Sequence, residues 1–139
     1  MNKSEGFSLL ELVVVLGIVG LLTTVALPAY QRNIQSGARA EGQRLLLQVA
    51  AEQERFYASH HSYSISASPM SAPAPMSLMS EGGLYEVTVA ACVDGTIANC
   101  FLATATPVGT QADDICGVLT LSSTGLKTAV GGGVRDCWR

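Results

Sequence analysis

The chain has 139 residues, of which 48% are hydrophobic and only 14% charged, and its formal net charge is −3. This length allows one modest domain and an N-terminal segment, and the negative balance argues against a general nucleic-acid binder, which is usually strongly basic. The sequence has no nucleophile–histidine–acid set and no phosphate-binding loop, and its only two histidines, His60 and His61, are adjacent. We therefore expect no enzymatic activity, no cofactor and no metal site.

A membrane-length apolar run follows a short polar leader. Residues 1–6 carry one lysine and end in Gly6, and residues 7–30 are almost entirely apolar except for Glu11. A helix needs about 20 apolar residues to cross hydrocarbon, and an acid inside it costs about 3 kcal/mol. A positive leader stays in the cytoplasm, so the remainder should face outward. The alternatives are a secretory signal cut after Ala26 and a plain membrane anchor, and neither explains Glu11.

The apolar run contains two residues that weaken a helix, Gly20 and Pro28. A glycine costs about 1 kcal/mol relative to alanine inside a helix, and a proline about 3 kcal/mol. Pro28 also removes the hydrogen bond to the carbonyl of Thr24, so we expect a bend there. From residue 31 to about residue 59, apolar residues recur at three- and four-residue steps, which predicts an amphipathic continuation of the same helix.

Residues 60–83 are rich in serine, proline and methionine, which predicts an irregular helix-to-sheet loop, with a short turn near residues 76–79. Beyond the loop, residues 84–139 form the predicted globular region. Apolar and polar residues alternate at 84–91, 101–106 and 117–122, and these three segments are the strand candidates.

Four cysteines lie in the last third of the chain, at positions 92, 100, 116 and 137. An even number of cysteines beyond a membrane segment indicates two disulfides in an oxidising compartment rather than free thiols in the cytosol. The cysteines do not have the C-x-x-C spacing that is typical of zinc sites, so a zinc site is not expected. Three pairings are possible. An Asp-Gly turn between the first two cysteines predicts a hairpin closed by Cys92–Cys100, which leaves Cys116–Cys137 to tie the C-terminal tail to the sheet.

The string Gly6-Phe7-Ser8-Leu9-Leu10-Glu11 and the apolar helix after it resemble the class III signal of type IV pilins and pseudopilins. The resemblance implies that a prepilin peptidase cuts after Gly6 and methylates the new N-terminus at Phe7. It also implies that Glu11 pairs with the amine of a neighbouring subunit during assembly. In filaments of this family the segment matching Gly20 to Pro28 is often unwound, whereas a lone subunit is expected to keep it helical but bent.

The C-terminal half is similar to PilE-type minor pilins and to the competence pilins that bind DNA-uptake sequences; the similar stretches are 103–107, 116–121 and Asp136-Cys137-Trp138-Arg139. This resemblance implies an α+β fold. A long N-terminal helix, from about residue 8 to 59, packs on an antiparallel sheet of about four strands. Cys116 and Cys137 match the bridge that closes the family's C-terminal loop, and the extra pair, Cys92 and Cys100, makes the competence pilins the nearer comparison.

The expected function is therefore that of a type IV pilus subunit, and of a minor rather than a major pilin. Its expected partners are other pilins, the prepilin peptidase and the inner-membrane assembly platform. Its expected location is the inner membrane of a Gram-negative bacterium, crossed once with the C-terminus in the periplasm, and then the extracellular pilus.

Two other functions remain open: a pseudopilin of a type II secretion system, and a pilus-borne DNA receptor for natural transformation. The basic residues available for DNA in the head are Lys127, Arg135 and Arg139. Residues 60–139 contain these three basic residues and six acidic ones, so their formal charge is −3. Because affinity for phosphate depends on accumulated lysine and arginine, this balance argues against a strong DNA site.

Overall fold

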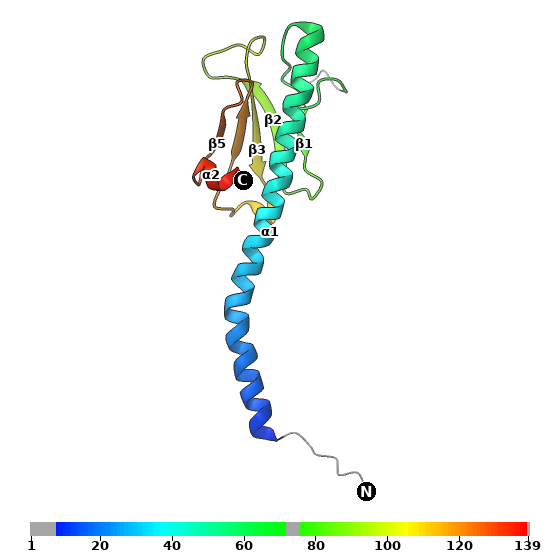
Figure 1. The fold of residues 1–139 in the computed structure, drawn as a ribbon. Coiled ribbons are helices and arrows are strands. Elements are labelled where there is room, and N and C mark those ends of the chain that lie inside the picture. The colour runs from blue at the N-terminus through cyan, green and yellow to red at the C-terminus, as the bar shows by residue number, and fades with distance from the viewer. Residues whose placement is uncertain (1–7, 72–75, 139) are drawn as a thin grey trace. The chain divides into compact units, whose positions relative to one another are not determined.

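The structure is a computed structural model that describes residues 8–71 and 76–138. The predicted cleavage and methylation positions, Gly6 and Phe7, and the basic residue Arg139 lie outside the described residues. The chain divides into two compact units, residues 1–34 and 35–139. The elements in chain order are α1 (Leu9–His60), β1 (Leu78–Met79), β2 (Tyr85–Ala91), β3 (Phe101–Pro107), the short 3₁₀ helix η1 (Gly109–Gln111), β4 (Leu119–Ser122), β5 (Lys127–Ala129) and α2 (Val134–Cys137), as Figure 1 shows.

Helix α1 agrees closely with the predicted helix of about residues 8 to 59. Both Gly20 and Pro28 lie within it, so this segment is helical, and the bend expected at Pro28 stays a prediction. The helix ends where His61 adopts a φ of 56°, in the left-handed region, while its N–H donates to the carbonyl of Tyr57 at 2.8 Å. Glycine usually occupies this position after a helix, so the sequence gives no clear stop signal here.

The five strands form one antiparallel sheet in the order β1-β2-β3-β4-β5. The prediction of about four strands missed one. A turn was expected near residues 76–79, and the structure instead pairs Leu78 with Val87 and Met79 with Glu86. The outer strands β1 and β5 have two and three residues, too few for apolar alternation to reveal them. Their partners on the neighbouring strands specify them instead.

The core lies between the second half of α1 and one face of the sheet. The buried helix residues recur at three- and four-residue steps, and the buried strand residues alternate with exposed ones, as the two periodicities require. The closest approach is at Gly42, where a Cβ would lie 2.7 Å from Cγ of Tyr85. The buried apolar core consists of Leu46, Val49, Ala67, Tyr85, Val87, Val89, Phe101, Ala103, Ala105, Leu119 and Leu121 with the cystine of Cys116 and Cys137.

The loop after α1 is fixed by one buried amide. Gln53 is fully buried in the helix; its Nε2 donates to the carbonyl of Ser66 at 2.7 Å, and its Oε1 accepts from the backbone N–H of Ser64 at 2.9 Å. Both ends of the amide are therefore satisfied, which removes the cost of burying it. This pair of hydrogen bonds holds a serine-rich segment against the helix although its composition alone predicts an irregular chain.

Both disulfides form the pairs expected from the sequence. Cys92 is joined to Cys100 at the tip of the hairpin between β2 and β3, where the N–H of Gly95 donates to the carbonyl of Cys92 at 3.1 Å. Cys116 is joined to Cys137, and both are buried. The second bridge closes a C-terminal loop, residues 116–137, that contains β4, β5 and α2.

Candidate functional site

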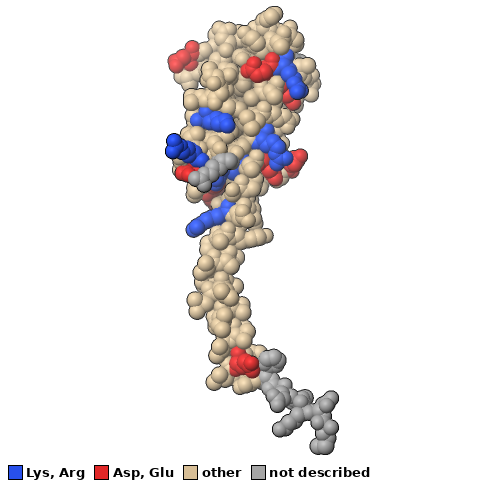
Figure 2. All heavy atoms as spheres, in the orientation of Figure 1, with Lys and Arg blue, Asp and Glu red and all other residues tan. Residues whose placement is uncertain are grey.

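The described part of the N-terminal unit is an apolar helix with one acid near its start. An 18-residue window of α1 has a mean hydropathy of 2.5 and is 0% buried, so this helix is long and apolar enough to cross a membrane. Every residue from Ser8 to Ile34 is exposed. Glu11 lies in the first turn and is the only charged side chain from Ser8 to Tyr30, and Figure 2 shows a red patch on an otherwise uncharged stretch of the helix. A carboxylate near a helix N-terminus is favoured by the helix dipole.

The two threonines between Gly20 and Pro28 satisfy their hydroxyl groups within the helix. Thr23 Oγ1 donates to the carbonyl of Gly20 and Thr24 Oγ1 to the carbonyl of Leu21, each at 2.8 Å. A hydroxyl without a partner is costly in an apolar environment, and these bonds remove that cost. The segment is therefore compatible with hydrocarbon despite its polar side chains.

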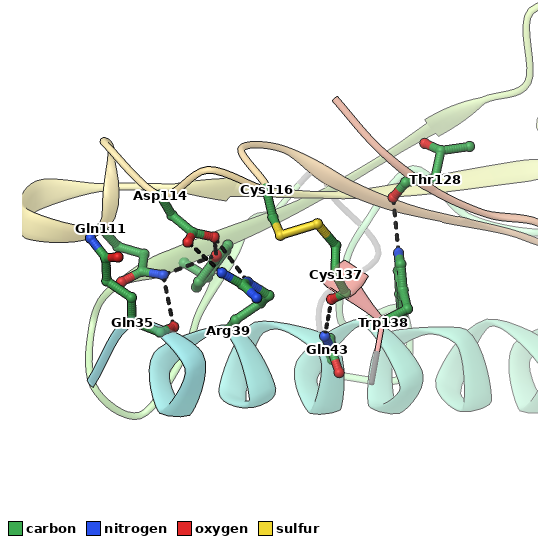
Figure 3. Close-up of a disulfide and its surroundings, with 10 residues drawn as sticks. Gln35, Arg39, Gln43, Gln111, Asp114, Cys116, Thr128, Cys137 and Trp138 are labelled. Carbon is green, nitrogen blue, oxygen red and sulfur yellow. Dashed lines mark hydrogen bonds and ion pairs between the residues drawn. A yellow bond between two sulfur atoms is a disulfide. The ribbon is translucent and has the colours of Figure 1, made fainter. Parts of the chain in front are cut away.

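In the C-terminal unit, three residues at four-residue steps along α1 contact residues 111 and 114, just before Cys116, and Cys137: these helix residues are Gln35, Arg39 and Gln43 (Figure 3). Their spacing places them on one face of the helix. The carbonyl of Gln35 accepts from Nε2 of Gln111 at 3.1 Å, and Nε2 of Gln43 donates to the carbonyl of Cys137 at 2.5 Å. The segment before the disulfide-closed loop and the last residue of that loop are thus attached to the same helical face.

The middle contact is an ion pair between Arg39 and Asp114. Nε of Arg39 donates a hydrogen bond to Oδ2 of Asp114 at 3.0 Å, and Nη2 donates one to Oδ1 at 2.5 Å, so the guanidinium contacts both carboxylate oxygens. The side chain of Asp114 is 0% exposed and that of Arg39 is 13% exposed. Hydrogen bonding to this carboxylate raises the pKa of Arg39 above its ordinary value, and burial raises the pKa of Tyr85, whose hydroxyl donates to Asp114 at 3.3 Å. The charge of Asp114 is therefore fully compensated.

Two of the three basic residues predicted for DNA contact, Lys127 and Arg135, lie on two elements that contact each other, β5 and α2 (Figure 1). Lys127 begins β5, and its Nζ lies 4.9 Å from the ring centroid of Trp138. The indole Nε1 of Trp138 donates to the carbonyl of Thr128 at 2.9 Å (Figure 3). This hydrogen bond fixes the ring on which the ammonium group lies. Arg135 is exposed on α2. The structure thus presents a cation on an aromatic ring beside a second, exposed cation.

Comparison with known proteins identifies the family. A family model described as "Type IV minor pilin ComP, DNA uptake sequence receptor" matches residues 28–120, and a model of the prokaryotic N-terminal methylation motif matches residues 1–27. The first match covers more than half of the chain. The chain belongs to this family of type IV pilins.

Curated relatives of this type IV pilin include fimbrial protein Q of Moraxella bovis, which is 41% identical over 51 residues (37% of this chain and 31% of that protein). The type IV major alpha-pilin of Moraxella bovis is 53% identical over 34 residues, 24% of this chain and 21% of that protein. The pilin thus matches about a third or less of these relatives' length. A type IV pilin structure from Shewanella oneidensis aligns with a TM-score of 0.49 and 27% identity, covering 67% of this chain and 89% of that one.

Sequence reasoning missed the buried ion pair of this type IV pilin. Asp114 belongs to a pair of adjacent acids after η1, and nothing in the local pattern distinguishes it from Asp113, which is exposed. The four-residue spacing of the polar side chains at 39 and 43 is the one signal that could have indicated a polar face in contact with another element; residue 35 takes part through its backbone carbonyl.

The two histidines of the pilin have no ligand-binding arrangement in the structure. The ring of His60 stacks on Phe56 with centroids 3.9 Å apart, and its Nδ1 lies 2.8 Å from Oγ of Ser59. Among residues 8–71 and 76–138, no group of three or more histidine, cysteine, aspartate or glutamate side chains could hold a metal ion.

Proposed function

We propose that this chain is a minor subunit of a type IV pilus, made as an inner-membrane prepilin and drawn into the filament through its apolar helix. The observation that carries the proposal is the exposed apolar half of α1, which none of the described residues 8–71 and 76–138 covers and which bears Glu11. Such a surface is stable in hydrocarbon or against similar helices of other subunits. The match of residues 28–120 to a minor pilin family favours a pilus over a type II secretion system.

Processing follows from the N-terminal methylation motif at residues 1–27. In the proposed sequence of events, a prepilin peptidase cuts after Gly6 and methylates Phe7, and the assembly platform then extracts the helix from the membrane. The new amine of one subunit pairs with Glu11 of its neighbour, which offsets the burial of both charges. The proposed topology is a single span with the C-terminus in the periplasm of a Gram-negative bacterium.

Replacement of Gly6 tests the processing step. Gly6→Val should leave an uncleaved precursor in the membrane fraction, because a side chain at the cut obstructs the protease. An immunoblot of membrane and sheared-pilus fractions separates precursor from mature chain. Normal processing of the variant would contradict the assignment of the signal.

Replacement of Glu11 tests assembly separately. Glu11→Val should be cleaved normally but fail to enter sheared pili, because the neighbour's amine would be buried without a partner. Glu11→Asp is the matched control, since it keeps the charge and shortens the side chain by one methylene. Wild-type amounts of Glu11→Val in pili would exclude the pairing role.

A second candidate function, reception of double-stranded DNA, is favoured by the name of the matched family, a DNA uptake sequence receptor, and by the placement of Lys127 on Trp138 beside Arg135. Against it stands the head charge of −3 over residues 60–139. One cation held on an aromatic ring and a second, exposed cation support a weak, salt-sensitive site rather than a strong one.

A gel shift with residues 31–139 tests this candidate. We expect micromolar binding that weakens as salt rises, and a Lys127→Ala, Arg135→Ala double variant should lower the salt dependence by about 2 in the logarithmic slope. Asp94→Ala, at the hairpin tip, raises the net charge without touching this surface and serves as the control. Equal binding by the double variant and the wild-type chain would exclude this surface as the site.

A further inference from the structure

A groove with charges of both signs lies between helix α1 and strand β1 of the C-terminal unit (Figure 1). Its volume is about 210 Å³, which is less than the roughly 300–1,000 Å³ of pockets for drug-sized ligands. The helix contributes Glu41, Arg44 and Leu45, whose three- and four-residue spacing places them on one face, and residues 78–81 form the other wall. The groove therefore has room for a small molecule.

Part of the lining is aliphatic. Leu45 and Leu78 line the groove and are partly buried against the core of the unit. Met79 lines it too and is 51% exposed, and the flexible thioether of methionine adapts to the shape of an apolar group. The groove thus gives a short aliphatic group a surface on which to leave water.

The acidic part of the lining is fixed by a tight turn between β1 and β2. The N–H of Gly83, whose φ of 66° favours glycine, donates to the carbonyl of Ser80 at 2.8 Å. Oε2 of Glu41 accepts from the N–H of Gly82 at 3.0 Å, so the helix is tied to the same turn. Glu81 lies within this turn and is exposed. The backbone that carries the second carboxylate is therefore in place before a ligand arrives.

The charges that line the groove do not neutralise one another. In the part of the chain that the structure describes, the one ion pair is that of Arg39 with Asp114, so neither Arg44 nor Glu81 has an ionic partner there. Glu41 and Arg44 are three residues apart, a spacing at which helical side chains can pair, yet Glu41 accepts from a backbone N–H instead. Two carboxylates disfavour a phosphate in this groove, and the guanidinium disfavours a metal ion. A ligand with both signs would satisfy all three groups.

We propose that this groove binds a free aliphatic α-amino acid in its zwitterionic form. The ammonium group of the ligand lies between the carboxylates of Glu41 and Glu81. Its carboxylate accepts from the guanidinium of Arg44, which matches a carboxylate with two parallel N–H groups. Its side chain lies on Leu78 and Met79. This class of ligand combines both charges and an apolar group in one small molecule, as the lining requires.

This inference goes beyond the proposed function, which depends on the apolar helix alone. The groove and the apolar half of α1 belong to different units of the chain. A chain that binds no amino acid would still have the helix that assembly requires, so the failure of one proposal leaves the other standing.

Methyl NMR of the full chain in detergent micelles, with L-leucine as the probe, tests the proposal. Isotope labels on the methionine methyl groups report Met79 in the groove and, as a control, Met70, which is 62% exposed and does not line it. We expect the Met79 signal to shift and saturate with a Kd of about 1 mM while the Met70 signal stays in place. A Met79 signal that does not move at about 20 mM leucine, or an equal shift at Met70, would overturn the proposal.

Two derivatives of leucine separate the ionic contacts. Leucinamide keeps the ammonium group and the side chain but has no carboxylate, and N-acetylleucine keeps the carboxylate but has no ammonium group. Each should bind about tenfold more weakly than leucine, the scale of one hydrogen bond to a charged group. A derivative that binds as tightly as leucine would show that the groove does not recognise a zwitterion, and the proposal would be wrong.

Substitutions assign the contacts to residues. Arg44→Met and Glu81→Gln should each weaken leucine binding about tenfold, and Arg44→Met should no longer distinguish leucine from leucinamide. The matched controls are Arg55→Met, an exposed arginine of the same helix, and Asp94→Asn at the hairpin tip; neither residue lines the groove, so both variants should keep the wild-type affinity. Wild-type affinity in Arg44→Met or in Glu81→Gln would contradict the proposed site.

Discussion

The ion pair of Arg39 and Asp114 allows the sharpest stability prediction. Arg39→Met keeps most of the apolar stem but removes both hydrogen bonds to a carboxylate that is 0% exposed. Breaking one partner of a buried pair costs about 3–5 kcal/mol, because the remaining charge is buried without compensation. The hydroxyl of Tyr85, at 3.3 Å from Oδ2, compensates part of it, so we expect about 3 kcal/mol. For a unit of this size, that loss lowers Tm by roughly 10–20 °C.

The assay is urea unfolding of residues 31–139 with both disulfides intact, for the wild-type chain, Arg39→Met, Asp114→Asn and the double variant. The double variant should be more stable than Arg39→Met, because it removes the buried negative charge together with its partner. Arg44→Met, an exposed arginine on the same helix, is the control and should change stability by less than about 0.5 kcal/mol. A loss below about 1 kcal/mol for Arg39→Met, with no coupling in the cycle, would refute the reasoning.

Three further predictions concern the same unit. The free energy of unfolding should decrease as the pH rises above about 10. Burial raises the pKa of Tyr85 and Tyr63 in the folded state, so the unfolded chain loses these phenolic protons at a lower pH than the folded chain does. In urea unfolding, Tyr85→Phe should make this decrease with pH smaller. Replacing Cys116 and Cys137 together by serine should cost about 3 kcal/mol in the same assay, from the loop of 21 residues that they close. Gly42→Ala should cost about 2 kcal/mol, because its Cβ would lie 2.7 Å from Cγ of Tyr85; a thermal melt unchanged from the wild type would contradict this close packing.

The long helix could be predicted because its signals are local. Apolar composition up to residue 30 and three- to four-residue periodicity beyond it give bounds within one residue of Leu9–His60. The central strands were also predictable, since Tyr85, Val87 and Val89 alternate with exposed neighbours over seven residues. The order of the cysteines around an Asp-Gly turn similarly indicated the pairing that the structure has.

What the sequence could not provide depends on partners far along the chain. Strand β1 exists because Leu78 lies opposite Val87, and two residues carry no periodicity of their own. Asp114 is buried because Arg39 reaches it across 75 positions. Trp138 was noted only as part of a C-terminal string, and its place under Lys127 depends on a hydrogen bond to the carbonyl of Thr128.

The stripe of Gln35, Arg39 and Gln43 has a mechanical consequence. Tension that reaches the C-terminal unit along α1 acts parallel to the helix axis, and the three side-by-side attachments at these residues carry it in shear together. Gln35 and Arg39 attach to Gln111 and Asp114, just before Cys116, and Gln43 attaches to Cys137, so the contacts lie at both ends of the Cys116–Cys137 bond. Because the disulfide joins these two attachment sites covalently, a load on them passes through the bond and not through the strands between the two cysteines.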